Sequence, residues 1–307
     1  MQKEPGRISL ARLPTPIESY DRLVPGLRVK RDDLTGSTLS GNKVRKLEYL
    51  LADARSRRKK HVVTCGGIQS NHCRATALAA AQLGLRCTVL LRSPSARASY
   101  DAATGNLRLM QLSGAHIVWV TPDEYRNQRQ ELMAEIAGTD GKVIVEGGSD
   151  GLGSLGYVRA VDELLKQREA PTSIVVATGS GGTLAGLTLG ARRRGLDIPV
   201  LGVAVCDDAP TFQAICARVA REARELLPDL PALEANDFVV VEGYAGRGYA
   251  VSSPQELDLL ATVARRTGLL LDPVYTAKAF QFLVSRDPRL GAKPLFIHTG
   301  GLPGLLA

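Results

Sequence analysis

A lysine at the start of a predicted helix is the first residue of this chain that suggests chemistry. Lys43 follows the turn Gly41-Asn42, and helical periodicity continues from it through Tyr49. A cation is disfavoured at a helix N-terminus, because the helix dipole is positive there. Most lysines in this setting are exposed and structural. The alternative is an amine whose pKa is lowered by its surroundings and which forms a Schiff base.

A glycine-rich loop supplies a second chemical feature. Residues 178–183 read Thr-Gly-Ser-Gly-Gly-Thr, between an apolar run and a segment with helical periodicity. Such a loop lets backbone N–H groups converge at a helix N-terminus, which is a site for a phosphate group. The loop lacks the lysine of GxxxxGK[ST] and the spacing of GxGxxG, so it indicates neither a nucleoside triphosphate nor a dinucleotide. Packing of a tight turn is the alternative interpretation.

A third loop has the same arrangement of strand, turn and helix. Residues 65–72 read Cys-Gly-Gly-Ile-Gln-Ser-Asn-His. Ser70 or Asn71 is a good N-cap for the helix that follows. The same hydroxyl and amide, with the imidazole of His72, are also suited to hold a ligand carboxylate. The pattern leaves capping and ligand binding open, and His72 could be a buried structural histidine.

The elements that must position these loops alternate between strand and helix. Short runs rich in β-branched residues predict strands at 61–65, 87–91, 116–120, 142–145, 173–177, 200–205, 238–241 and 294–298. Apolar residues at three- and four-residue spacing predict helices at 43–57, 70–83, 101–113, 122–137, 152–168, 182–194, 209–226, 254–267 and 275–285. Nearly continuous apolar strands predict an α/β fold with two open, mostly parallel twisted sheets flanked by helices.

The order of these elements predicts two domains with a cleft between them. Residues 46–149 form a small Rossmann-like domain with four strands, and residues 1–45 together with 150–307 form the larger domain. In open parallel sheets a ligand binds outside the carboxyl ends of the strands, so we expect the site in the interdomain cleft.

Composition excludes several classes of protein. The net charge is +8, from 39 basic and 31 acidic residues, but the charge is dispersed and aromatic residues are few, so we expect no nucleic-acid partner. No apolar run approaches membrane-spanning length, and the N-terminus lacks the pattern of a secretory signal, which predicts a cytoplasmic protein without a membrane partner. The five cysteines are scattered and predict neither disulfides nor a metal site.

Several ordered motifs resemble one family of pyridoxal phosphate enzymes. The stretch from Arg31-Asp32-Asp33 to the motif SGNKVRKLE at 40–48 is similar to the lysine motif of the 1-aminocyclopropane-1-carboxylate deaminase and D-cysteine desulfhydrase family. The further matches, in the same order, are GGIQSNH at 66–72, GGSDGLGSLGYV at 147–158, TGSGGTLAGL at 178–187, LLLDPVYTAKA at 269–279 and FIHTGGLPGL at 296–305. The resemblance implies the fold type II of these enzymes, a homodimer and a pyridoxal 5′-phosphate cofactor.

The resemblance also implies a role for each loop. Lys43 would hold the cofactor as a Schiff base and Asn71 would hydrogen-bond its 3′-oxygen. Ser70, Asn71 and His72 would face the substrate carboxylate, and Thr299 would approach the pyridine nitrogen. The phosphate would bind to the backbone of Gly179, Ser180, Gly181, Gly182 and Thr183.

Two tyrosines complete the implied catalytic set. Tyr249 and Tyr275 match the active-site tyrosines of the family and would act with Lys43 and Ser70. The implied reaction is β-elimination, with proton removal from Cα by the lysine amine and release of pyruvate and ammonia.

A few positions indicate which member of the family the chain resembles. His72 stands where the deaminases have a glutamine, and Thr276 stands where they have a glutamate, so D-cysteine is the expected substrate. The chain departs from the family pattern at Ser40, Asp150 and the run 246–252, which contains Arg247. A cation at Arg247 would suit a second anionic group, so cysteate sulfo-lyase activity is one alternative and 1-aminocyclopropane-1-carboxylate deaminase activity is another. A protein that binds pyridoxal phosphate or an amino acid without turnover is the alternative of a different class.

Overall fold

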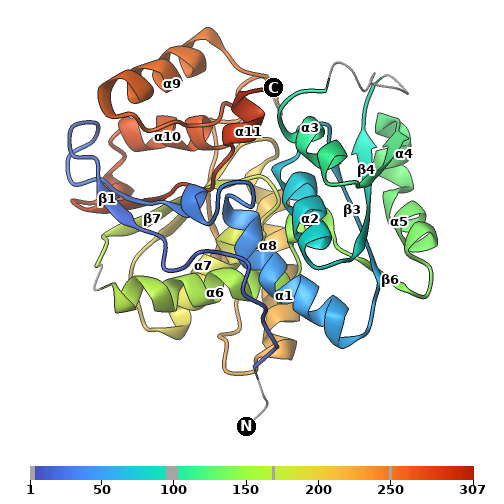
Figure 1. The fold of residues 1–307 in the computed structure, drawn as a ribbon. Coiled ribbons are helices and arrows are strands. Elements are labelled where there is room, and N and C mark those ends of the chain that lie inside the picture. Colours follow the sequence, from blue (N-terminus) through green and yellow to red (C-terminus); the bar gives the residue numbers. More distant parts are fainter. Residues whose placement is uncertain (1–3, 95–102, 168–169, 249–250) are drawn as a thin grey trace.

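Two mostly parallel sheets form the framework of the protein. The computed structural model describes residues 4–94, 103–167, 170–248 and 251–307 (Figure 1). The larger sheet has the strand order β1 (Ile17–Ser19), β2 (Arg28–Lys30), β10 (Pro294–Ile297), β7 (Ser173–Thr178), β8 (Val200–Ala204) and β9 (Val239–Val241). Its neighbouring strands are parallel except β1 and β2, which pair antiparallel. The smaller sheet is parallel throughout, in the order β5 (His116–Val120), β4 (Arg86–Arg92), β3 (His61–Gly67) and β6 (Gly141–Val143).

Helices cover both sheets, which confirms the predicted fold class. The helices are α1 (Asn42–Ser56), α2 (Asn71–Gln82), α3 (Gly105–Leu112), α4 (Pro122–Asn127), α5 (Arg129–Ala137), α6 (Gly151–Lys166), α7 (Gly182–Arg193), α8 (Ala209–Leu226), α9 (Pro254–Thr267), α10 (Thr276–Val284) and α11 (Leu302–Leu305). Within the described ranges, no helix has both the length and the apolar character that crossing a membrane requires.

The central strands are mostly apolar on both of their faces because each sheet is covered by helices on both sides. Along β7, Ile174 and Val176 belong to the core formed with α6, α7 and α8. The alternate residues Val175 and Ala177 belong to the core formed with α9 and α10. The same alternation in the smaller sheet directs Val62 toward α1 and α2 and Val63 toward α5. This two-sided burial is why the sequence shows continuous apolar runs rather than strict alternation.

The strand order creates two switch points, one in each sheet. The chain leaves β7 toward β8, while β10 lies on the other side of β7. Likewise β4 and β6 lie on opposite sides of β3. Loops that leave neighbouring strands in opposite directions open a crevice at the carboxyl ends of those strands. Of the three loops singled out in the sequence, the turn at 65–72 lies at the end of β3 and the glycine loop at the end of β7. The turn that contains Gly41 comes directly before α1.

Three features of the fold differ from the sequence-based expectations. The strands β1 and β2 were not predicted, because three residues of mixed polarity carry no periodic signal. The short helix α11 was also not predicted. The helix expected over 122–137 is two helices, because Gln128 has a non-helical backbone conformation between α4 and α5.

The proposed domain division remains a prediction. All strands of the smaller sheet lie within residues 61–143, and the N-terminal strands join the larger sheet. The predicted boundary between residues 45 and 46 falls inside α1, which contacts both α6 and α2.

Candidate active site

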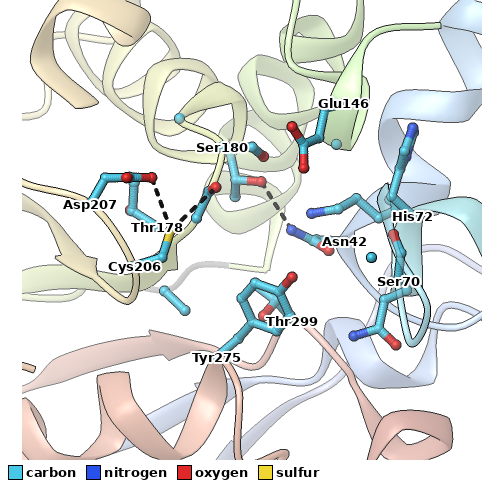
Figure 2. A pocket seen from close by; sticks show the side chains of 18 of the residues that line it. Asn42, Ser70, His72, Glu146, Thr178, Ser180, Cys206, Asp207, Tyr275 and Thr299 are labelled. Carbon is cyan, nitrogen blue, oxygen red and sulfur yellow. Dashed lines mark hydrogen bonds between the residues drawn. The ribbon is translucent and has the colours of Figure 1, made fainter. Parts of the chain in front are cut away.

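A cavity of about 380 Å³ lies where the carboxyl ends of the two sheets meet. Figure 2 shows residues of both sheets around it, with Tyr275 and Thr299 facing Ser180 and Glu146 across the space. Ten residues that the sequence singled out line it: Lys43, Ser70, Asn71, His72, Gly179, Ser180, Gly181, Thr183, Tyr275 and Thr299. Gly182 is buried and is not among the lining residues, and Tyr249 lies outside the described residues.

Lys43 presents an amine to this cavity. It is the second residue of α1, and none of the described residues forms a hydrogen bond or ion pair with its Nζ. Removal from water lowers the pKa of Lys43 to about 8, although the carboxylates of Glu146 and Asp272 oppose that shift. A lysine with a lowered pKa and no partner is suited to nucleophilic attack on a carbonyl carbon.

The glycine loop forms the start of α7 and carries free backbone donors. Gly181 is the N-cap residue with a φ of 75°, a left-handed conformation that favours glycine. A Cβ at this position would also lie 2.7 Å from Ile215 Cγ2. In the described chain, no acceptor receives the backbone N–H of Ser180, Gly181 or Thr183. These donors and the positive end of the α7 dipole form a cradle for an anion.

A buried lysine lies directly behind this cradle. Lys46 Nζ donates to the carbonyl oxygen of Gly147 at 3.1 Å and to Ser149 Oγ at 3.0 Å. Ser149 Oγ in turn lies 2.9 Å from Ser180 Oγ and accepts from the backbone N–H of Gly182 at 3.2 Å. Burial, and then the charge of Lys43, hold the pKa of Lys46 well below its usual value. The N–H of Gly182 also donates to the carbonyl oxygen of Ser180 at 2.9 Å, so it is directed to these two acceptors rather than to the cavity.

The start of α1 is tied to both sides of the larger sheet's switch point. Asn42 Nδ2 donates to Thr183 Oγ1 at 3.1 Å, a bond marked at Asn42 in Figure 2. The backbone N–H of Asn42 donates to the carbonyl oxygen of Thr299 at 3.1 Å. Gly41, with a φ of 95°, permits this approach, because a Cβ there would lie 2.6 Å from the same oxygen. These contacts place Lys43 between the glycine loop and the end of β10.

The turn after β3 combines capping with exposure to the cavity. Ser70 is the N-cap of α2, and its Oγ accepts from the backbone N–H of Cys73 at 3.2 Å. Asn71 Oδ1 accepts from Asn106 Nδ2 at 3.0 Å, which holds the amide against the start of α3. The capping interpretation of Ser70 is confirmed, and the side chains of both residues still line the cavity.

His72 has a mainly structural setting. Its Nε2 lies 2.8 Å from Thr64 Oγ1, and that hydroxyl donates to the carbonyl oxygen of Ile144. Thr64 must then accept the proton of His72 Nε2, which leaves Nδ1 as an acceptor without a partner among the described residues. Burial and the charges of Lys43 and Lys46 hold the pKa of His72 well below its usual value, so the ring is neutral.

A group of arginines that the sequence reading did not identify forms another wall. Arg92, Arg126 and Arg129 line the cavity next to Tyr125, and we call these three residues the arginine face. The guanidinium carbons of Arg92 and Arg129 lie 5.2 Å and 5.4 Å from the centroid of the Tyr125 ring. The signal that could have revealed part of this face is the spacing of 126 and 129, which brings two side chains to one side of a helical segment.

Two carboxylates and a thiol also line the cavity. Glu146 follows β6 and is exposed to the cavity, and Asp207 accepts from the Cys206 thiol at 3.2 Å (Figure 2). The pKa of Cys206 is raised to about 12 by burial and by Asp207, so the thiol stays protonated.

Arg247 and Asp150, which differ from the family pattern, are not among the residues that line the cavity. Arg247 is exposed and donates to the carbonyl oxygen of Ser252 at 3.2 Å. Asp150 is the N-cap of α6 and accepts from the backbone N–H of Gly153 at 2.7 Å. The hypothesis that Arg247 adds a cation to the cleft is not supported, while Asp150 has a structural role.

These residues fit pyridoxal phosphate. The cofactor needs an amine for its aldehyde and an anion cradle for its phosphate, and both open into one cavity of suitable volume. Among the described residues, the amine of Lys43 and the backbone N–H groups of Ser180, Gly181 and Thr183 have no partner. The two groups to which the resemblance assigns the cofactor thus line the same cavity.

Comparisons with known proteins agree with this fit. The family model described as "Pyridoxal-phosphate dependent enzyme" matches residues 8–300. The bifunctional D-cysteine desulfhydrase/1-aminocyclopropane-1-carboxylate deaminase of Arabidopsis thaliana, a mitochondrial protein, is 41% identical over 97% of this chain and 78% of its own length. The crystal structure of an ACC deaminase homologue superposes with a TM-score of 0.88 at 38% identity, covering 98% of this chain and 93% of that one.

A more distant structure shows the fold alone. An L-serine ammonia-lyase from Rhizomucor miehei superposes with a TM-score of 0.67 at 17% identity, covering 99% of this chain and 98% of that one. At this identity the likeness concerns the fold and not the activity. On the match over residues 8–300 and the 41% identity, the chain belongs to the family of pyridoxal-phosphate dependent enzymes.

Proposed function

We propose that this enzyme catalyses β-elimination on a small amino acid, with D-cysteine as its substrate and pyruvate, ammonia and hydrogen sulfide as its products. The observation that carries the proposal is the amine of Lys43 in the same cavity as the phosphate cradle of Gly179–Thr183. One water molecule is consumed, because pyruvate gains the oxygen that replaces the amino nitrogen.

We assign a task in this reaction to several of the residues that the sequence singled out. Bound pyridoxal phosphate would accept the electron pair of the Cα–H bond, which is the chemistry that the cofactor supplies. Lys43 Nζ would take the proton from Cα as general base. Ser70 and Asn71 would bind the substrate carboxylate. The hydroxyls of Tyr249 and Tyr275 would transfer protons to or from the leaving group.

Thr299 supports elimination rather than transamination. It is the second residue after β10, it lines the cavity, and we assign its hydroxyl to the pyridine nitrogen. A hydroxyl is a weaker proton donor than a carboxylic acid. Thr299 would therefore leave that nitrogen less protonated than an acid would, which would favour prompt loss of the leaving group.

The setting of Thr276 favours an acyclic substrate. Thr276 is fully buried, and its Oγ1 donates to Asp272 Oδ1 at 2.7 Å. It is not among the residues that line the cavity, so this position offers no acid to assist the opening of a cyclopropane ring. This argues for D-cysteine over 1-aminocyclopropane-1-carboxylate, which remains the second candidate.

The test is pyruvate release from a panel of amino acids by the purified enzyme. The panel contains D- and L-cysteine, β-chloroalanine, cysteate, D-serine and 1-aminocyclopropane-1-carboxylate. We expect turnover of D-cysteine and β-chloroalanine, and turnover of the cyclopropane compound alone would contradict the proposal. A protein that only binds the cofactor would release no pyruvate from any of them.

The lysine assignment is tested by substitution. Lys43→Ala should abolish both pyruvate release and the absorbance of the covalently held cofactor, while Lys60→Ala, at an exposed position, should change neither. Full activity in Lys43→Ala would exclude the assigned general base.

Two further properties belong to the proposal. We assign the enzyme to the cytoplasm and expect a homodimer. Light scattering of the purified protein tests the second, with a mass near twice 32.8 kDa expected.

A further inference from the structure

The arginine face belongs to elements of the smaller sheet, whereas the phosphate cradle belongs to the larger sheet. Arg92 is the last residue of β4, Arg126 lies near the end of α4, and Arg129 begins α5. The cradle follows β7 of the larger sheet. The cofactor phosphate therefore has its own site, and the arginine face lines a separate part of the same cavity.

Tyr125 holds the arginine face in position. Its ring is 4% exposed, and its hydroxyl lies 3.5 Å from Cys65 Sγ in the core of the smaller sheet. The guanidinium groups of Arg92 and Arg129 both lie over this ring, an arrangement that stabilises a cation. The burial of the ring fixes the two cations relative to β3 and β4.

Arg129 is anchored at the break between α4 and α5. Its Nη1 donates to the carbonyl oxygens of Tyr125 at 3.0 Å and Arg126 at 3.1 Å. Within the described chain, no carboxylate forms an ion pair with Arg129, and its Nε and Nη2 donate to no acceptor. A guanidinium group has five N–H donors in a planar fork, so Arg129 retains donors for an anionic ligand.

The charge of the cavity favours an anion beyond the cofactor. Four cationic side chains line it in the described residues, Lys43 and the arginine face, against the carboxylates of Glu146 and Asp207. The contact of Arg126 with Asp123 is 3.5 Å long, and both side chains are largely exposed, so it neutralises little charge.

We infer that the arginine face is a subsite for an anionic β-substituent of the substrate, so that the enzyme accepts amino acids whose leaving group is a sulfonate or a phosphate. This inference rests on the proposed β-elimination. In this inference the anionic β-substituent, which is the second anionic group of the substrate after its carboxylate, binds to Arg92, Arg126 and Arg129 and not to Arg247. With cysteate, the Cβ–S bond breaks, sulfite leaves with the bonding electrons, and water then releases pyruvate and ammonia.

The test compares charged and uncharged substrates in matched variants. Pyruvate release is measured with cysteate and O-phosphoserine, each as D and L forms. β-Chloroalanine serves as the substrate whose β-substituent is uncharged. Arg129→Gln should lower kcat/KM for the anionic substrates by about 10- to 100-fold, the effect of one charged hydrogen bond. It should change kcat/KM for β-chloroalanine by less than about 3-fold, because that substrate has no anionic β-substituent for Arg129 to bind.

Two further variants separate binding from structure. Arg129→Lys keeps the charge and should recover part of the lost activity on anionic substrates. Arg86→Gln removes an exposed arginine at the opposite end of β4 and should leave all activities unchanged. Raised salt should weaken turnover of the anionic substrates more than that of β-chloroalanine.

Two results would overturn the inference. One is an equal loss of kcat/KM on charged and uncharged substrates in Arg129→Gln, which would indicate a structural role for the arginine. The other is a wild-type enzyme that processes β-chloroalanine but none of the anionic substrates, which leaves the proposed β-elimination intact. If the wild-type enzyme released no pyruvate from β-chloroalanine or D-cysteine either, the result would instead contradict the proposed function itself.

Discussion

Asn42 and Thr183 are 141 positions apart in the sequence and are joined by a hydrogen bond of 3.1 Å between Nδ2 and Oγ1. Asn42 precedes Lys43, and Thr183 closes the glycine loop. The bond therefore couples the amine that would hold the cofactor to the backbone that would hold its phosphate.

We predict that Asn42→Ala weakens cofactor binding by about 2- to 10-fold, the loss expected for one neutral hydrogen bond. Titration of the apo-protein with pyridoxal phosphate, followed by absorbance, measures this. Thr183→Val should give a similar loss, and the double variant should lose little more, since both remove the same bond. Asn236→Ala, at an exposed position, is the control. Unchanged affinity in both single variants would show that the bond does not order the site.

The pKa of Lys43 predicts a pH dependence of covalent cofactor uptake. Because this pKa is lowered to about 8, the neutral amine predominates above that pH rather than above the usual value for lysine. The rate of uptake by the apo-protein should rise about tenfold per pH unit below 8 and level off above it. Stopped-flow absorbance from pH 6 to 10 measures the profile.

A substitution tests the electrostatic origin of this profile. Glu146 raises the pKa of Lys43 against the effect of burial, so Glu146→Gln should move the break to lower pH. A break near 10 in the unaltered protein would show that the amine is in contact with water.

Ser70 can be tested for its two roles separately. Ser70→Ala removes the N-cap of α2 and should lower the free energy of unfolding by about 1 kcal/mol. Ser70→Asp retains a capping oxygen but brings a negative charge to the site assigned to the substrate carboxylate. It should keep most of the stability while raising KM by about tenfold or more, as repulsion between like charges requires.

The remote cap Ser253 provides the comparison for Ser70. Ser253 accepts from the backbone N–H of Glu256 in the same geometry, at the start of α9. Ser253→Ala should lower stability by a similar amount with no change in KM. An unchanged KM in Ser70→Asp would contradict the assigned contact with the substrate carboxylate.

A buried ion pair beneath the site predicts a large effect on stability. Asp32 accepts from Arg45 at 2.7 Å and from Tyr157 at 2.6 Å, and all three side chains are buried. Asp32→Ala leaves the Arg45 guanidinium without this partner and should lower the free energy of unfolding by about 3–5 kcal/mol. Urea denaturation measures this, with Asp197→Ala at a fully exposed position as the control.

The same pair predicts the direction of a pH effect. Despite burial, which raises it, the pKa of Asp32 is lowered overall, because Arg45 and Tyr157 stabilise the carboxylate. The pair therefore stabilises the fold above the pKa of an unfolded aspartate, and the stabilisation is lost as pH falls below it. Asp32→Ala should make stability below about pH 4 less dependent on pH than in the unaltered protein. An unchanged acid profile would show that other carboxylates dominate it.

The sequence alone determined the parts of this protein that depend on local patterns. Strands buried on both faces read as continuous apolar runs, so eight of the strands and the fold class were predicted. The phosphate loop and the lysine were found because each combines residue type with a position at a helix start. The three-residue strands β1 and β2 escaped because they are too short to show periodicity.

Only the tertiary structure decided which side chains share the cavity. Arg92 lies at the end of β4, and Arg126 and Arg129 lie on either side of the break between α4 and α5, so no local pattern relates them to Lys43. The sequence directed attention to Arg247 instead, because that residue departs from a motif, yet it lies in an exposed loop. The physical reason is that motif and periodicity describe neighbours along the chain, whereas the field inside a cavity is set by groups that folding brings together.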